Sequence, residues 1–188
     1  MNKFVKEDLY RYEGPHGTGL LKLWRYIIFT PGFRYVYLYR KASTSKWRIT
    51  KLFWEINLRL CSWQTAIQIP STTQIGRGFR IVHFGHIVVN PGAKIGNNFN
   101  VSQGVLIGSS EGKMAGVPTI GDNVCINANA IVVGRAKIGN NVLIAPGAFV
   151  NFDVPDNSIV IGNPGKIIPK DRPTDKFIVY PLPIGPNE

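Results

Sequence analysis

The three histidines of this 188-residue sequence are its clearest candidates for acid–base chemistry. His83 and His86 stand three residues apart in an extended stretch, so their side chains point to different sides and pair poorly on one metal ion. His16 lies far away in the amino-terminal segment. No Ser-His-Asp or metal-ligand spacing surrounds any of them, and the sequence therefore predicts no metal. A neutral imidazole can instead act as a general base.

The two cysteines add no second kind of site. Cys61 falls in a helical-looking stretch and Cys125 in a short repeat, far apart in the chain. Neither spacing is typical of a zinc site or a disulfide framework. The chemistry is thus expected to depend on the histidines and on whatever elements hold them.

The elements that hold the histidines can be predicted from an aliphatic residue that recurs every six positions. A period of six fits neither a helix nor an alternating strand, but it is typical of a solenoid in which three hexads close one coil. An ordinary β-sandwich would not keep such a grid. Gly and Asn between the anchors suit tight turns. The anchors are Ile69, Ile75, Ile81, Ile87, Ile95, Val101, Ile107, Ile120, Ile126, Val132, Ile138, Ile144 and Val150, and Ile161 and Ile167 keep the spacing after a break.

The repeats carry a resemblance to a known family. IGRGFR, IVHFGH, IGNNFN, VSQGVL, IGDNVC, INANAI, IGNNVL and IAPGAF resemble the hexads of the hexapeptide-repeat acyltransferases. The resemblance implies a mainly β fold, a left-handed parallel β-helix over residues 67–169. A small α-helical segment, residues 1–66, precedes it, and a Pro-rich tail, residues 170–188, follows. Within the family, residues 67–168 look most like the serine acetyltransferases and the related sugar and polysaccharide O-acetyltransferases.

The same resemblance assigns the catalytic residue. His83 falls where the serine acetyltransferase branch carries its catalytic histidine, which would take the proton from an acceptor hydroxyl as it attacks the acetyl thioester. His86 stands where that branch usually has glycine, so a substrate contact is expected there. The alternative for His83 is a histidine that only fills a turn.

The acceptor side departs from the serine enzymes. Gln68 occupies the position of the carboxylate that orients the histidine, and Val82 replaces an acid. Gly116 and Val117 stand where an arginine and a histidine help to hold serine. With Gln68 and Val117 as acceptor contacts, these departures favour a sugar hydroxyl of a surface polysaccharide or its precursor, a saccharide acceptor. The alternatives are a serine O-acetyltransferase and a catalytically silent β-helix scaffold.

The donor side is closer to the family, whose acyl donor is acetyl-CoA. By resemblance, small residues line the path of the pantetheine arm, and one lysine meets the phosphates of CoA. The family also implies a homotrimer with active sites between subunits. The donor residues are Gly108, Ser109, Ala128, Pro146 and Lys166.

The amino-terminal segment is basic and rich in apolar residues. Residues 1–66 carry a net charge of +8, which suits an anionic partner, but no nucleic-acid-binding motif is present. Helical patterns are expected over residues 3–12, from Leu20 to Pro31, from Phe33 and over residues 45–61. In the last of these, one apolar stripe holds Ile49, Leu52, Phe53, Ile56, Leu60 and Trp63, and another holds Trp47, Trp54 and Leu58.

Two uses of these helices stay open. They are expected to pack on each other and on the β-helix, in a cytoplasmic protein without a signal peptide or a span long enough to cross a bilayer. The alternative is a peripheral contact with the inner face of the cell membrane. That contact would use Trp24, Tyr26, Tyr35, Tyr37, Trp47 and Trp54, which alternate with arginines.

Overall fold

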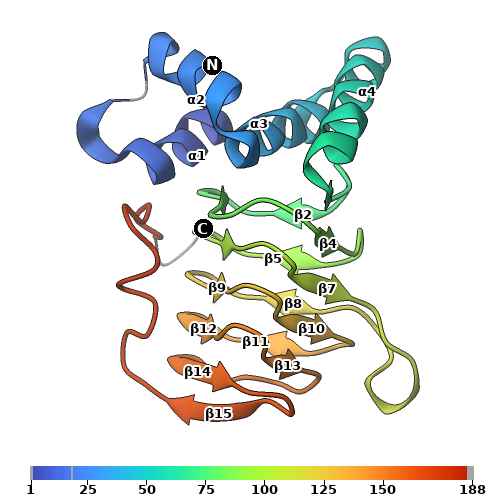
Figure 1. Ribbon diagram of the computed structural model, residues 1–188, viewed down its shortest axis with the longest axis vertical. Helices are drawn as coiled ribbons and strands as arrows, with labels where there is room; N and C mark the ends of the chain where they lie inside the picture. The colour runs from blue at the N-terminus through green and yellow to red at the C-terminus, as the bar shows by residue number, and fades with distance from the viewer. Residues whose placement is uncertain (1, 18, 186–188) are drawn as a thin grey trace.

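Short parallel strands wind into a three-sided coil that makes up most of the molecule (Figure 1). The computed structural model describes residues 2–17 and 19–185. The strands are β1 Ile67–Gln68, β2 Gln74–Ile75, β3 Arg80–Ile81, β4 Ile87–Val89, β5 Lys94–Ile95, β6 Asn100–Val101, β7 Leu106–Gly108, β8 Thr119–Ile120, β9 Cys125–Ile126, β10 Ile131–Val133, β11 Lys137–Ile138, β12 Val142–Ile144, β13 Phe149–Val150, β14 Ser158–Ile161 and β15 Lys166–Pro169.

Each side of the coil is one sheet. The first sheet runs β1-β4-β7-β10-β13, the second β2-β5-β8-β11, and the third β3-β6-β9-β12-β14-β15. Up to β13, each strand pairs in parallel with the strand three positions along the chain, as in Ile67↔Ile87 and Ile144↔Ile126. β14 pairs in parallel with β12 and antiparallel with β15. The predicted β-helix built from hexads is therefore confirmed.

The hexad anchors fill the inside of the coil. All thirteen anchors from Ile69 to Val150 are buried, with at most 7% of any of them exposed. Ile161 and Ile167 differ, because 41% and 37% of their surface is exposed. Their strands, β14 and β15, form an antiparallel hairpin that closes the coil, and Val154 and Val160 occupy the inside there instead.

Asparagines form one corner of the coil. Asn98, Asn123, Asn141 and Asn157 all have φ near +54°, a left-handed conformation that asparagine tolerates better than most residues. Their amides also bond between coils, since Nδ2 of Asn98 donates to Oδ1 of Asn123 at 2.9 Å. The turn function expected for these asparagines has a direct structural basis.

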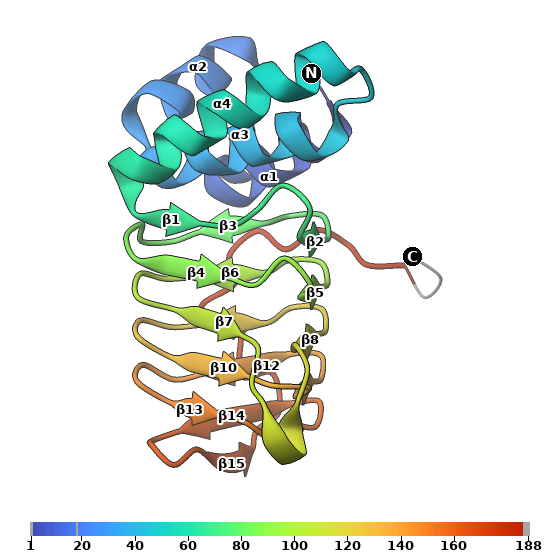
Figure 2. The same cartoon turned by 90° about the vertical axis from the view of Figure 1, so that its right-hand side faces the viewer.

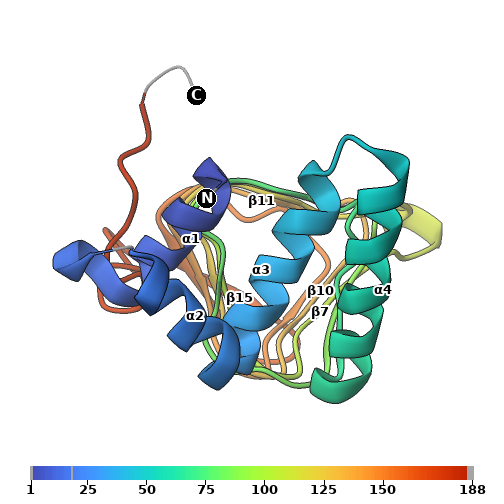
Figure 3. The ribbon, with the colours of Figure 1, turned by 90° about the horizontal axis from the view of Figure 1, so that it is seen from above.

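Helices cap the β1 end of the coil (Figure 2). Asn2 caps the first helix by accepting a hydrogen bond from the Phe4 amide, and Pro31 starts the third, where its missing N–H costs nothing. Seen from above, α3 lies between α1 and α4 (Figure 3). The helices are α1 Lys3–Glu13, α2 Leu20–Phe29, α3 Pro31–Thr44 and α4 Arg48–Thr65, with a 3₁₀ turn over Gly14–His16.

A buried ion pair fastens this cap to the first coil. Nε of Arg40 lies 2.7 Å from Oδ2 of Asp8, and both side chains are almost fully buried. Arg40 Nη1 donates to the carbonyl oxygen of Ile75 at 2.7 Å, while Asp8 Oδ1 accepts from the Phe79 amide at 2.8 Å. Two helices and the first coil thus share one polar network.

The two apolar stripes of α4 have different surroundings. Leu58, in the stripe with Trp47 and Trp54, is buried and Trp54 is half-buried, whereas Trp47 is exposed. The other stripe, here called the α4 outer face, is 47–85% exposed along its whole length. The expected packing of the helices accounts for only part of their apolar surface. The α4 outer face consists of Ile49, Leu52, Phe53, Ile56, Leu60 and Trp63.

The aromatic residues named for a membrane contact divide in the same way. Tyr35 is buried and Tyr26, Tyr37 and Trp54 are half-buried, whereas Trp24 and Trp47 are exposed. Within the described residues, no helix has the length and apolar character needed to cross a membrane.

The carboxy-terminal tail returns along the outside of the third sheet (Figure 1). Ile178 packs against Cys125 and Leu143, and the Leu182 amide donates to Asn98 Oδ1 at 2.9 Å. Near the cap, the Tyr180 ring meets that of Tyr10 edge to face. The tail therefore spans the coils from the closing hairpin to α1; its last residues, 186–188, lie outside the described residues.

Candidate functional site

His83 and His86 lie in the turn that joins β3 to β4. Both side chains are exposed, and neither imidazole hydrogen-bonds to another group among the described residues. His86 has φ = 52°, a left-handed conformation that glycine would adopt without strain. The proposed base, His83, is thus placed on the surface, where a single chain neither orients nor covers it.

Two predicted donor residues stack along the same corner of the coil. This corner, here called the His83 edge, consists of the turns at residues 82–86, 102–105, 127–130, 145–148 and 162–165. The register Ile144↔Ile126 puts Pro146 one coil from Ala128, and the Gly147 amide donates to the Ala128 carbonyl oxygen at 2.9 Å. Pro146 is exposed and Ala128 half-buried.

Lys166 ends this edge. It opens β15, is exposed, and pairs with Ile161 across the last turn. Four steps of about 4.8 Å separate the His83 turn from this one, a run of ~19 Å. An elongated ligand along the edge would bring its anionic end to Lys166 and its reactive end to His83.

Three further predicted contacts, Gly108, Ser109 and Val117, occupy the opposite edge of the first sheet. Gly108 ends β7, Ser109 begins an arm over residues 109–117, and Val117 is half-buried where the arm returns to β8. The Ser110 amide donates to the Gly116 carbonyl oxygen at 3.2 Å and closes the arm. The width of the first sheet separates this edge from the His83 edge, so one chain does not bring both sets into one cleft.

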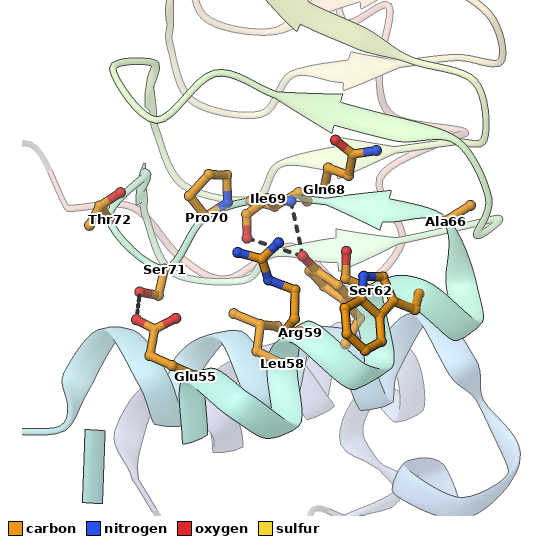
Figure 4. A pocket seen from close by; sticks show the side chains of 12 residues that line it. Glu55, Leu58, Arg59, Ser62, Ala66, Gln68, Ile69, Pro70, Ser71 and Thr72 are labelled. Carbon is orange, nitrogen blue, oxygen red and sulfur yellow. Dashed lines mark hydrogen bonds between the residues drawn. The ribbon is translucent and has the colours of Figure 1, made fainter. Parts of the chain in front are cut away.

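Gln68 borders a cavity of about 610 Å³ between α4 and the first coil (Figure 4). The Ser71 hydroxyl donates a hydrogen bond to Glu55 Oε1 across it, and the Arg59 side chain lies on the same side of α4. Because β1 pairs with β4 as Ile67↔Ile87, Ala66 in the cavity wall stands one coil above His86. The cavity and the His83 turn are therefore neighbours.

Glu55 and Arg59 give this cavity one charge of each sign. They stand four residues apart on α4 and so project from one side of the helix. A carboxylate and a guanidinium side by side can hold the ammonium and carboxylate of an amino acid. The sequence analysis did not name this pair, although an acid four residues before an arginine in a predicted helix was a signal available in the sequence.

Other nucleophiles and metal sites are not supported. Cys125 and Cys61 are buried, and burial raises the pKa of the Cys125 thiol to about 12. Over residues 2–17 and 19–185, no three His, Cys, Asp or Glu side chains cluster as metal ligands. A surface imidazole beside a charged cavity is what this part of the chain offers for catalysis.

Comparison with known proteins settles the family. A family model described as bacterial transferase hexapeptide (six repeats) matches residues 118–151. The serine acetyltransferase of Helicobacter pylori (strain ATCC 700392 / 26695) is 32% identical over 151 residues, which cover 79% of this chain and 88% of that protein. The chain belongs to the hexapeptide-repeat transferase family. It is an acyltransferase, as the sequence analysis expected.

Other members of this hexapeptide-repeat transferase family agree. The serine acetyltransferase of Bacillus subtilis (strain 168) is 41% identical over 106 residues, 55% of this chain and 48% of that protein. Soybean serine acetyltransferase, solved as the apoenzyme, is 27% identical with a TM-score of 0.71, covering 88% of this chain and 67% of that one. The fold shared with such structures is the left-handed parallel β-helix.

These relatives correct the predicted acceptor. The sequence analysis placed this transferase nearest to the sugar and polysaccharide O-acetyltransferases, and that placement was wrong, because the matching relatives are serine acetyltransferases. The error came from treating Gln68, Val82, Gly116 and Val117 as the whole acceptor site. Four missing side chains say little about acceptor class when α4, outside the repeats, brings charged side chains to a cavity beside the first coil.

Proposed function

We propose that this chain is a serine O-acetyltransferase, which moves an acetyl group from acetyl-CoA to the hydroxyl of L-serine. The observation that carries the proposal is the similarity to the Helicobacter pylori enzyme, which extends over 88% of that protein. The acyl donor remains acetyl-CoA, as expected from the sequence. A cytoplasmic location stays a prediction from the sequence.

In the proposed reaction, His83 is the general base. Its imidazole takes the proton of the serine hydroxyl while that oxygen attacks the thioester carbonyl of acetyl-CoA. The tetrahedral intermediate then expels the CoA sulfur, and the imidazolium returns the proton to the leaving thiolate. The products are O-acetylserine and CoA, with no metal required to balance the step.

The charged cavity is the proposed acceptor site. Arg59 would pair with the serine carboxylate and Glu55 with its ammonium. These two side chains would take over the role of the arginine and histidine whose positions Gly116 and Val117 occupy in this chain. Gln68 and Ala66 border the same cavity, and Ala66 stands one coil from His86. Gln68 can donate or accept a hydrogen bond where the family has a carboxylate.

The activity is tested by following thiol release from acetyl-CoA with purified protein. L-serine should give O-acetylserine at millimolar concentration, detected by mass spectrometry, and L-alanine, which has no hydroxyl, should give only background hydrolysis. Thiol release with a glycan panel but none with serine would reject the proposed acceptor.

The role of Arg59 gives a sharper prediction. Arg59→Gln should raise the KM for L-serine by roughly 10- to 100-fold, because a hydrogen-bonded charge pair with the carboxylate is lost. The KM for acetyl-CoA should stay unchanged. Arg48→Gln, on the same helix but outside the cavity, is the matched control. An unchanged KM for serine in Arg59→Gln would show that the acceptor is held elsewhere.

We propose a homotrimer, because one chain does not bring all the predicted contacts into one cleft. The His83 edge and the arm edge carry different predicted contacts, and a neighbour placed with its arm edge against the His83 edge would unite them. Light scattering should then give three times the chain mass of 20.9 kDa.

A further inference from the structure

The α4 outer face is not the only exposed apolar surface of the cap. A second one, here called the α2 outer face, consists of Leu20, Leu21, Trp24, Ile28 and Phe29, which are 56–86% exposed. Both faces belong to the helices at one end of the coil, with α3 packed between α2 and α4 (Figures 2 and 3). Such a concentration of exposed large side chains marks an interaction surface.

The charges around these faces have a single sign. All four acidic side chains of residues 1–66 are at least partly buried and engaged: Glu7 with Arg77, Asp8 with Arg40, Glu13 with Lys22, and Glu55 with Ser71. The exposed ionic groups on α2 and α4 are basic. Apart from Arg59, which lines the cavity, they are Arg25, Arg48 and Lys51, and Lys46 lies just before α4.

We propose that the cap docks this protein on an anionic lipid surface through the α4 and α2 outer faces. A surface-bound helix has an apolar face with tryptophan, phenylalanine and leucine and a polar side rich in lysine and arginine. The α4 outer face has this composition, with Trp63 at one end and Trp47 just before the other. It runs for about 21 Å, at 1.5 Å per residue. Because the same helix carries exposed basic residues, we expect it to lie in the interface plane and not to cross it.

The same charges argue against a second copy of this chain as the occupant. Two caps facing each other would oppose basic groups to basic groups, because the exposed ionic groups of α2 and α4 are basic. Anionic lipid headgroups supply the complementary charge, and the acyl region takes up the apolar side chains.

Vesicle sedimentation of the full chain tests this surface. The protein should sediment with vesicles of phosphatidylglycerol and phosphatidylcholine but poorly with phosphatidylcholine alone. Binding should fall as salt rises from about 0.05 M to about 0.5 M, because screening weakens the attraction. Ile49→Glu, at a residue 85% exposed, should lower the partition coefficient at least about tenfold, and Ile56→Glu should do the same.

Two controls make the test decisive. Ile168→Glu places the same charge on an aliphatic residue that is 42% exposed at the far end of the coil, and should bind vesicles like the wild type. Circular dichroism confirms folding of all three variants. Equal binding by Ile49→Glu and the wild type, or no binding to anionic vesicles, would overturn the proposal. So would a larger assembly of wild type that Ile49→Glu splits, because the face would then join copies of the chain.

Discussion

His83→Ala lowers the rate of acetyl transfer by roughly 100- to 10,000-fold, the usual contribution of a general base. The imidazole lies exposed in the β3–β4 turn, so its removal leaves no cavity in the core. Thermal unfolding and the mass by light scattering should therefore match the wild type. Calorimetry should give an unchanged affinity for CoA, since the small residues of the His83 edge remain.

His86→Ala serves as the matched control for this substitution. It removes an equally exposed imidazole three residues away and should act mainly on the KM for the acceptor. A His83→Ala variant that keeps more than a tenth of the wild-type rate would exclude His83 as the base. If both variants fold normally but lose activity, the catalytic role belongs to the β3–β4 turn as a whole and not to His83 alone.

Asp8→Ala lowers the free energy of unfolding by about 3–5 kcal/mol, the usual cost of leaving one member of a buried ion pair without its partner. Arg40 would keep its charge in a site where only 3% of its side chain is exposed. Urea unfolding followed by circular dichroism measures the change. Asp8→Ala with Arg40→Leu should recover part of the loss, because no unpaired charge remains.

Glu7→Gln, on the same helix, is the comparison for this measurement. Its ion pair with Arg77 is partly exposed, and such pairs contribute about 0–1 kcal/mol. If Asp8→Ala costs no more than Glu7→Gln, the Asp8–Arg40 pair does not hold the cap to the coil.

The fold could be predicted because its information is local. Each hexad carries its own anchor and turn residues, so the grid from Ile69 to Val150 defines the coil without knowledge of distant contacts. The helices were predicted nearly as well, because Pro31 marks a boundary that the structure keeps. The grid misled at Ile161 and Ile167, where the spacing continues although the strands reverse direction.

The site was harder to predict, because its parts come from segments that no repeat relates. His83 could be singled out by resemblance, and the coil length relates Pro146 to Ala128. Nothing in the hexads places Glu55 and Arg59 above the first coil, and helical periodicity does not reveal which of two stripes on α4 faces inward. The acceptor was mispredicted for the same reason, since the residues weighed lie in the coils or in the arm over residues 109–117, and none lies in the helices.

The returning carboxy-terminal tail affects how the stack of coils unfolds locally. A stack of coils held only by nearest neighbours frays from its ends, one coil at a time. Here Lys170 bonds the Asn157 carbonyl oxygen near one end of the stack, and Leu182 bonds Asn98 near the other. While the tail is bound at both places, one coil cannot detach alone. Amide protons at both ends of the stack should therefore exchange with solvent through one shared opening event instead of successive local ones.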